Sequence, residues 1–180
     1  MISVLLAEGF EEIEALTPVD ILRRAGLDVK LLSVTDKLEV TGSHGISVIA
    51  DGFAKDHLGS ALDGLVLPGG MPGTLGLDAS EYTDILLKKA LENSRPIGAI
   101  CAAPLILGRR GLLKGKRAVC YPGFENELVG AYVTDAPVVT DGLTVTSKGM
   151  GAALPFAKEL VRLLAGDDAA KKIEDTIMEK

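Results

Sequence analysis

The sequence has no tryptophan, only two cysteines and two histidines, and 4% aromatic residues among its 180. Its core must therefore be mostly aliphatic, and a hydrophobic content of 47% can supply such a core without disulfides. The cysteines, Cys101 and Cys120, match no zinc-binding spacing. With so few histidines beside them, we expect no metal site and no other cofactor.

Targeting signals and basic patches are also missing. No apolar run reaches the ~18 residues that span a membrane, and the apolar start, residues 1–7, lacks the basic flank of a signal peptide. The net charge is −6, and the densest basic cluster, within residues 109–117, is too thin for a nucleic-acid footprint. We interpret that cluster as a solvated surface after a helix. We expect a cytoplasmic protein with reduced thiols and no nucleic-acid or membrane partner.

Apolar runs alternate with amphipathic segments along the chain. The pattern predicts buried strands and helices in turn, with two hairpins around residues 42–45 and 141–142. The predicted strands are Ile2–Ala7, Val29–Val34, Gly64–Leu67, Pro96–Ile100 and Arg117–Cys120; the predicted helices are Glu12–Ala25, Glu81–Asn93, Ala102–Arg110, Ala152–Ala165 and Asp168–Met178. This alternation predicts an α/β fold: one domain, residues 1–180, with a mainly parallel sheet covered by helices on both faces.

Cys101 directly follows a predicted buried strand and precedes a predicted helix. Ligands bind at the carboxyl ends of parallel strands, and a nucleophile elbow needs small residues two places before and after the nucleophile. Ala99 and Ala103 meet that need. The helix N-terminus is expected to lower the pKa of the thiol and so make it nucleophilic and oxidisable. The alternative is a buried structural cysteine.

Glu14 falls on the apolar side of the first predicted helix. At 100° per residue it lies between Ile21 and Ala25. A carboxyl buried there tends to keep its proton and can act as a general acid or base beside a thiol. The alternative is a solvated carboxylate at a frayed helix start, which we expect for Glu11 and Glu12.

Two further strand ends carry candidate residues. Gly69 and Gly70 follow the strand Gly64–Leu67, where backbone N–H groups could form an oxyanion hole, although such glycines often only make turns. Tyr121, after the strand Arg117–Cys120, could hydrogen-bond a substrate oxygen. Its neighbour Cys120 is either a resolving thiol for oxidised Cys101 or a small apolar strand residue.

Neither histidine lies next to Cys101 in the sequence. His44 is in a predicted hairpin and His57 in a polar stretch, and both are expected at the surface. A cysteine–histidine hydrolase needs its base within hydrogen-bonding reach of the thiol. Only His44 could approach through the fold or from a second subunit.

Four motifs, in this order, resemble the DJ-one/ThiJ/PfpI superfamily of parkinsonism-associated, deglycase-like proteins. They are Glu11–Glu14 followed by Pro18–Asp20 and Arg23–Gly26, then Leu67–Gly70, then Ala99–Pro104, and then Thr146–Gly151. The resemblance covers nearly the whole chain. It implies a flavodoxin-like three-layer sandwich, a homodimer, Cys101 as an oxidation-prone nucleophile, Glu14 as its protonated partner, and Gly69 and Gly70 as oxyanion donors.

The resemblance also implies a choice of activities. The first is a cysteine-dependent enzyme that acts on small α-oxoaldehydes or their glycation adducts, a glutathione-independent glyoxalase or deglycase. The second is an oxidative-stress sensor or chaperone that acts through a Cys101 sulfinate. A third hypothesis, apart from the family activities, is a protein that keeps the fold with a structural cysteine and has an unrelated binding role.

Three residues of the expected substrate pocket differ from those that members of the family carry at the same positions. Ala102 stands where the protease-like branch has a histidine, so a protease is not expected. Tyr121 stands where glyoxalase-active members often have a histidine, and a tyrosine, with its pKa of about 10, is a weaker base at neutral pH. His44 stands where some members carry an arginine.

Overall fold

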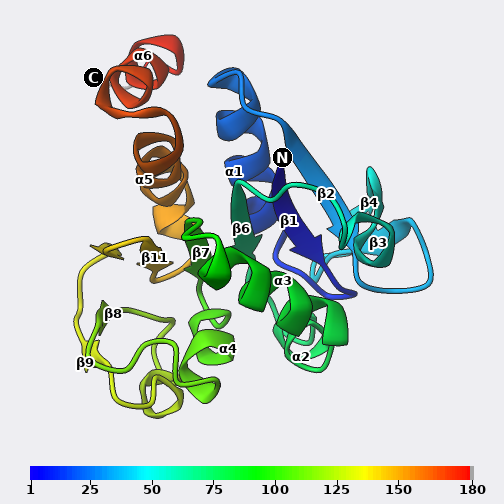
Figure 1. Ribbon diagram of the computed structural model, residues 1–180, viewed down its shortest axis with the longest axis horizontal. Helices are drawn as coiled ribbons and strands as arrows, with labels where there is room; N and C mark the ends of the chain where they lie inside the picture. Colours follow the sequence, from blue (N-terminus) through cyan, green and yellow to red (C-terminus); the bar gives the residue numbers. More distant parts are fainter. Residues whose placement is uncertain (179–180) are drawn as a thin grey trace.

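In the computed structural model, which describes residues 1–178, seven strands form one central sheet (Figure 1). These strands are β1 (Ile2–Leu6), β2 (Val29–Ser33), β5 (Gly52–Phe53), β6 (Gly64–Leu67), β7 (Ile97–Ile100), β10 (Val138–Asp141) and β11 (Thr144–Ser147). Their order across the sheet is β10-β11-β7-β6-β1-β2-β5. Only β10 and β11 pair in the antiparallel sense, and the other neighbours are parallel.

The strand order is the flavodoxin-like one. Numbered along the chain, β1, β2, β6, β7 and β11 lie in the order 2-1-3-4-5, with β5 added at one edge and β10 at the other. The prediction of a mainly parallel α/β sandwich is therefore confirmed. The carboxyl ends of these parallel strands meet along one edge of the sheet, and that edge carries the residues after β1, β6, β7 and β11.

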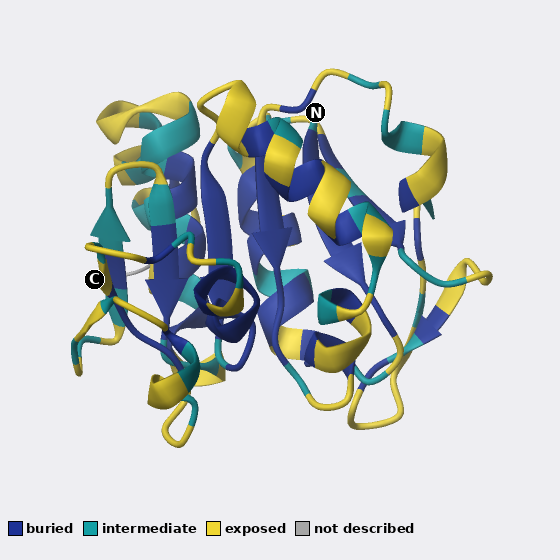
Figure 2. Ribbon diagram, turned by 60° about the horizontal axis from the view of Figure 1, so that its bottom comes forward, coloured by how far each residue is buried: buried dark blue, intermediate teal, exposed yellow. Residues whose placement is uncertain are grey.

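Helices cover both faces of the sheet, and Figure 2 shows the buried strands between them. One face packs against α1 (Glu12–Arg24), α5 (Ala153–Ala165) and α6 (Asp167–Thr176); the other packs against α2 (Gly73–Asp78), α3 (Glu81–Glu92) and α4 (Pro104–Arg109). Successive side chains of β1 point to opposite faces of the sheet. Val4 and Leu6 pack in the cluster with Leu22 of α1, whereas Leu5 packs in the cluster with Leu86 of α3. None of these helices is both long and apolar enough to cross a membrane.

Some elements differ from the sequence-based expectation. Residues 101–103 form a turn, so α4 begins at Pro104 and not at Ala102. The predicted strand Arg117–Cys120 is only β8 (Arg117–Ala118), which pairs with β9 (Tyr132–Val133) outside the central sheet. Helix α2 was not predicted, because it directly follows a run rich in proline and glycine. The final residues of the predicted domain, 179–180, lie outside the described residues.

Short elements complete the chain. The hairpin predicted around residues 42–45 is confirmed as β3 (Glu39–Thr41) paired with β4 (Ser47–Ile49). Three 3₁₀ turns are η1 (Ala54–His57), η2 (Glu125–Glu127) and η3 (Met150–Ala152).

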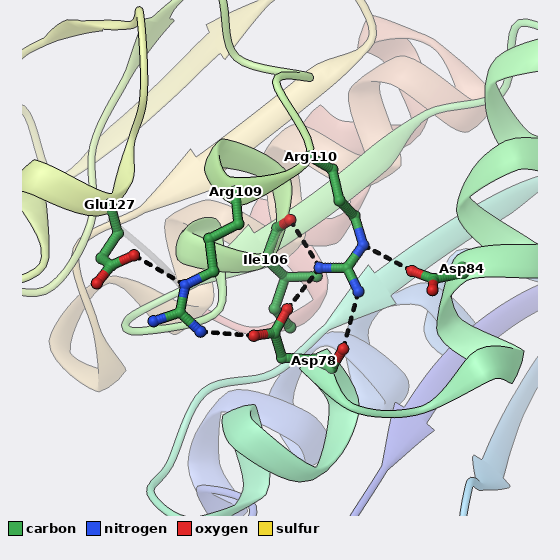
Figure 3. A network of polar contacts seen from close by, with 6 residues as sticks. All are labelled: Asp78, Asp84, Ile106, Arg109, Arg110 and Glu127. Atoms are coloured by element: carbon green, nitrogen blue, oxygen red, sulfur yellow. Dashed lines mark hydrogen bonds and ion pairs between the residues drawn. The ribbon is translucent and has the colours of Figure 1, made fainter.

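Arg109 and Arg110, interpreted from the sequence as a solvated basic surface, lie at the surface and are part of an ion-pair network. Both guanidinium groups bind the carboxylate of Asp78 at the end of α2 (Figure 3). Arg110 also binds Asp84 of α3, and Arg109 binds Glu127. Nearby carboxylates neutralise these cations, which tie the end of α4 to α2, α3 and η2.

Candidate active site

Cys101 occupies a strained elbow at the end of β7. Its φ angle is +64°, in the left-handed region that side chains other than glycine rarely adopt. Three backbone hydrogen bonds hold the turn: Cys101 N–H to Ser147 O (2.8 Å), Tyr121 N–H to Cys101 O (2.7 Å) and Ala103 N–H to Ile100 O (3.0 Å). Strain of this kind, about 1–3 kcal/mol, is typical of functional positions. The predicted elbow is present, and the turn keeps Cys101 partly exposed.

Glu14 lies against Cys101. It comes from the first turn of α1, its exposure is 1%, and its carboxyl makes a hydrogen bond with the thiol. Gly69 joins the two residues, because its N–H donates to Glu14 Oε2 at 3.1 Å. A Cβ atom added to Gly69 would lie 2.5 Å from Glu14 Oε2 and 2.6 Å from the Cβ of Cys101. Only a glycine leaves room for this contact.

The carboxyl and the thiol share a buried environment that raises both pKa values. Burial raises the pKa of Glu14 to about 7, and the charge of Glu11 contributes in the same direction. Burial, then the charge and hydrogen bond of Glu14, raise the pKa of Cys101 to about 12. Coupled groups titrate as a pair. Above about pH 7 the pair therefore carries one negative charge, which the carboxyl and the sulfur share.

The direction of the Cys101 shift is opposite to the sequence-based expectation. That expectation relied on a helix N-terminus, but α4 begins only at Pro104 and has six residues. The backbone N–H groups of Ala102 and Gly70 do bind the sulfur and lower its pKa, but burial and the Glu14 carboxylate outweigh them. The negative charge of Glu14 is one of the causes that raise the pKa of Cys101, so a proton on Glu14 makes the thiolate easier to form.

The glycine loop packs against the start of α1. Glu11 N–H donates to Gly69 O at 2.9 Å, and a Cβ atom on Gly70 would lie 2.3 Å from Glu11 N. Gly70 has a φ of +89°, so both its conformation and its surroundings require glycine. Because the Gly69 N–H is bound to Glu14, the N–H groups aimed at the sulfur are those of Gly70 and Ala102. This differs from the expected Gly69–Gly70 pair.

A cavity of about 520 Å³ opens above Cys101. Its lining comes from the ends of several strands: Glu11, Glu14, Gly70, Cys101, Tyr121, Pro122, Pro137, Lys148, Gly149, Met150, Gly151 and Ala152. Tyr121 therefore lies where the sequence placed it. Ala102 is 1% exposed and does not line the cavity, and its contribution is its backbone N–H.

His44 also lies outside the residues that line the cavity. It sits in the turn between β3 and β4, where its Nδ1 is 3.1 Å from Glu12 Oε2 and 3.4 Å from Glu11 Oε2. The hydrogen bond with Glu12, and then the charge of Glu11, raise its pKa. His44 therefore touches the site only through Glu11. His57 does not line the cavity either.

Cys120 packs on the other face of the sheet from Cys101. It is 3% exposed in the cluster that contains α3 and α4, whereas Cys101 contacts the cluster of α1 and α5. This position fits a small apolar residue better than a resolving thiol.

Glu11, Glu12 and His44 are the described residues whose potential metal-ligand atoms come within 4.8 Å of one another. Protein donors already occupy the two carboxylates. Ser43 Oγ donates to Glu11 Oε2, and His44 N–H donates to Glu12 Oε1. We assign no metal to this cluster.

The sequence-based prediction missed the wall formed by Lys148–Ala152. The signal was available, because the same strand-end rule that selected Cys101 applies to β11, and the residues after Ser147 are Lys148, Gly149 and Met150. Pro122 directly follows Tyr121 at a strand end that the sequence had indicated, whereas Pro137 comes from an irregular loop, which carries no such signal.

Comparisons with known proteins agree on one family. The sequence model of the DJ-1/PfpI family matches residues 1–163. Protein DJ-1 homolog B of Arabidopsis thaliana is 38% identical over 96% of this chain, which spans only 40% of that relative. A deglycase of Pyrococcus abyssi is 34% identical over 89% of this chain and 97% of its own length. The solved structure of oxidized DJ-1 from Toxoplasma gondii superposes with a TM-score of 0.94, at 35% identity, over 98% of this chain and 97% of that one.

Proposed function

The chain belongs to the DJ-1/PfpI family, and on that premise we propose that it is a cysteine-dependent enzyme for small α-oxoaldehydes or their glycation adducts. The observation that carries the proposal is the hydrogen-bonded pair of Cys101 and Glu14 on the wall of the cavity. A carboxyl whose pKa is about 7 can both accept and donate a proton at neutral pH. The relative from Pyrococcus abyssi is named a deglycase, which supports the same class of substrate.

The first step joins the substrate to the enzyme. The sulfur of Cys101 attacks the aldehyde carbon, the S–C bond forms, and the thiol proton passes to the Glu14 carboxylate. The carbonyl oxygen becomes an alkoxide beside the N–H groups of Gly70 and Ala102, which already point at the sulfur. Glu14 then gives its proton to that oxygen, which completes a hemithioacetal and leaves Glu14 as a carboxylate.

The second step moves hydrogen between two carbons of the substrate. Glu14, as a carboxylate, removes the proton from the hemithioacetal carbon. The electrons of that C–H bond form a C=C bond, the electrons of the neighbouring C=O bond move to its oxygen, and Glu14 gives the proton to that oxygen, which forms an enediol. Glu14 then takes the hydroxyl proton of the first carbon and delivers it to the neighbouring carbon while a C=O bond forms at the first carbon, so one carbon is oxidised and the other reduced with no outside oxidant. The product is a thioester, and water releases the hydroxy acid and restores the thiol of Cys101.

Two histidine-dependent alternatives are disfavoured. A cysteine–histidine protease needs a histidine in contact with the nucleophile, but Ala102 follows Cys101 and neither histidine lines the cavity. A histidine proton shuttle is also lacking, since Tyr121 is the residue at that part of the wall. Glu14 therefore performs the proton transfers of the proposed reaction.

A redox sensor or chaperone is the second candidate. The N–H groups of Gly70 and Ala102 at the sulfur could hold sulfinate oxygens, and the cavity gives peroxide access to Cys101. It ranks second, because direct oxidation needs the thiolate, which burial disfavours, whereas in the proposed enzyme Glu14 takes the thiol proton as the sulfur attacks.

Replacing Cys101 by alanine is expected to abolish lactate formation from methylglyoxal. The measurement is lactate, not loss of aldehyde, because amines and other thiols also consume the aldehyde. Peroxide treatment should abolish lactate formation in the wild type, and Cys120→Ala, which removes the other cysteine, serves as the matched control. Lactate formation that persists in the Cys101→Ala protein would exclude the enzyme; a wild type without turnover whose Cys101, but not Cys120, oxidises to sulfinate would favour the sensor.

The expected homodimer and cytoplasmic location stay predictions. Exposed apolar side chains near the start of α1 and on the hairpin support a contact between two copies: Ile13 is 49%, Ile46 56% and Ile49 68% exposed.

A further inference from the structure

The cavity is much larger than a three-carbon aldehyde. Its volume of about 520 Å³ corresponds to the liquid volume of roughly 17 water molecules at about 30 Å³ each. Cavities of this size usually bury ligands with many more atoms than methylglyoxal. The space beyond Cys101 is therefore available to a longer substrate.

The wall of that space is mainly apolar. Tyr121, Pro122, Pro137 and Met150 line it. Tyr121 and Met150 are 49% and 50% exposed, so a ligand can still cover them. Contact with such side chains favours a substrate with an aromatic or aliphatic body.

Lys148 is the one cationic residue in the described lining of the cavity. The Cys101 N–H donates to Ser147 O at 2.8 Å, which fixes the backbone before Lys148, and from there the Lys148 side chain extends to Asp135, which does not line the cavity. The Lys148 ammonium group pairs with Asp135, whose side chain is 95% exposed. Such exposed ion pairs are weak, so a substrate anion can replace Asp135.

The charges around the cavity would orient an anionic substrate. Glu11 and Glu14 line it beside Cys101, and both are carboxyl groups that repel an anion. Lys148 attracts the anion to another part of the lining. The uncharged carbonyl end is thereby left at Cys101.

We propose that Lys148 binds an anionic group of the substrate, and that the preferred substrates are α-oxoaldehydes with an apolar body and a carboxylate or phosphate at the far end. This inference rests on the proposed function, because it concerns the substrate of the same site. It makes Lys148 a residue that determines specificity, with no part in the proton transfers.

Steady-state kinetics with two matched probes test the inference. The probes are phenylglyoxal and 4-carboxyphenylglyoxal, which differ only in the carboxylate. In the wild type, kcat/KM is expected to be about tenfold higher for the charged probe, and this ratio should fall close to one in Lys148→Met. Lys171→Met, on the exposed part of α6, removes the same charge and should keep the wild-type ratio. Equal ratios in the wild type and Lys148→Met would overturn the inference and leave the proposed function standing.

A binding measurement separates this result from a failure of the proposed function. Ligands without an aldehyde, 4-acetylbenzoate, 4-acetylphenyl phosphate and uncharged acetophenone, are tested for protection of Cys101 against iodoacetamide. The inference expects the two anions to protect at about tenfold lower concentration than acetophenone, in the wild type and in Lys148→Arg, and not in Lys148→Met. The stronger of the two anions identifies the preferred group. Protection that does not depend on Lys148 would overturn the inference even if no turnover is found.

Discussion

A Glu14→Gln protein is expected to lose about 10²–10⁴-fold in kcat/KM for methylglyoxal, which is the usual contribution of a general acid or base. Glutamine keeps the shape of the side chain and can still accept the 3.1 Å hydrogen bond from Gly69 N–H. It cannot take the thiol proton or the proton of the hemithioacetal carbon. The measurement is lactate formation between pH 5 and 9. A loss below tenfold would show that another group moves these protons.

The stability of the same variant shows whether it is folded. The folded state holds the Glu14 proton up to about pH 7, whereas an unperturbed glutamate releases it near 4.5. Ionisation of Glu14 therefore costs stability as the pH rises from about 4.5 through 7, on the order of 3 kcal/mol. Glu14→Gln avoids this cost. It should be more stable than the wild type at pH 8 and similar to it at pH 4, as measured by urea unfolding.

A Gly69→Ala protein is expected to lose about 10²-fold in kcat/KM and about 1–3 kcal/mol of stability, because the methyl group would push Cys101 and Glu14 apart. The added Cβ atom would lie 2.5 Å from Glu14 Oε2, 2.6 Å from Cys101 Cβ and 3.0 Å from Ile100 O. Neither side chain of the pair is itself changed. The measurements are kcat/KM and the free energy of unfolding.

The matched control for this change is Gly59→Ala. Gly59 has no atom within 4 Å of an added Cβ, and it does not line the cavity. It should keep both the wild-type activity and the wild-type stability. A Gly69→Ala protein as active as Gly59→Ala would contradict the close contact of Glu14, Gly69 and Cys101.

The parts of this site that follow from local patterns could be predicted from the sequence. The apolar run before Cys101, with Ala99 and Ala103 around it, indicated the elbow. The helical phase of Glu14 indicated burial, and the structure gives it 1% exposure. Both predictions depend on only a few neighbouring residues. The rule that ligands bind at the carboxyl ends of parallel strands then placed Cys101 and Glu14 at the same edge of the sheet.

The parts that depend on competing energies could not be predicted in this way. The direction in which the pKa of Cys101 shifts depends on burial and on the distance to Glu14, which no sequence pattern gives. The use of the Gly69 N–H by Glu14 is likewise a tertiary contact. Arg109 and Arg110 looked like a basic surface because their partners, such as Asp78, are about thirty residues away in the chain.

The most direct test of the central claim, that Cys101 and Glu14 titrate as one catalytic pair, is the pH dependence of Cys101 alkylation by iodoacetamide. It is measured in the wild type and in Glu14→Gln, both with Cys120→Ser so that one thiol remains. The wild-type rate should rise at about pH 7, where the pair loses its first proton. The Glu14→Gln rate should lack this step and rise once, between the free-cysteine pKa of about 8.5 and the value of about 12 that burial and the charged partner together impose. Identical curves in the two proteins, with a single rise near 8.5, would contradict the account.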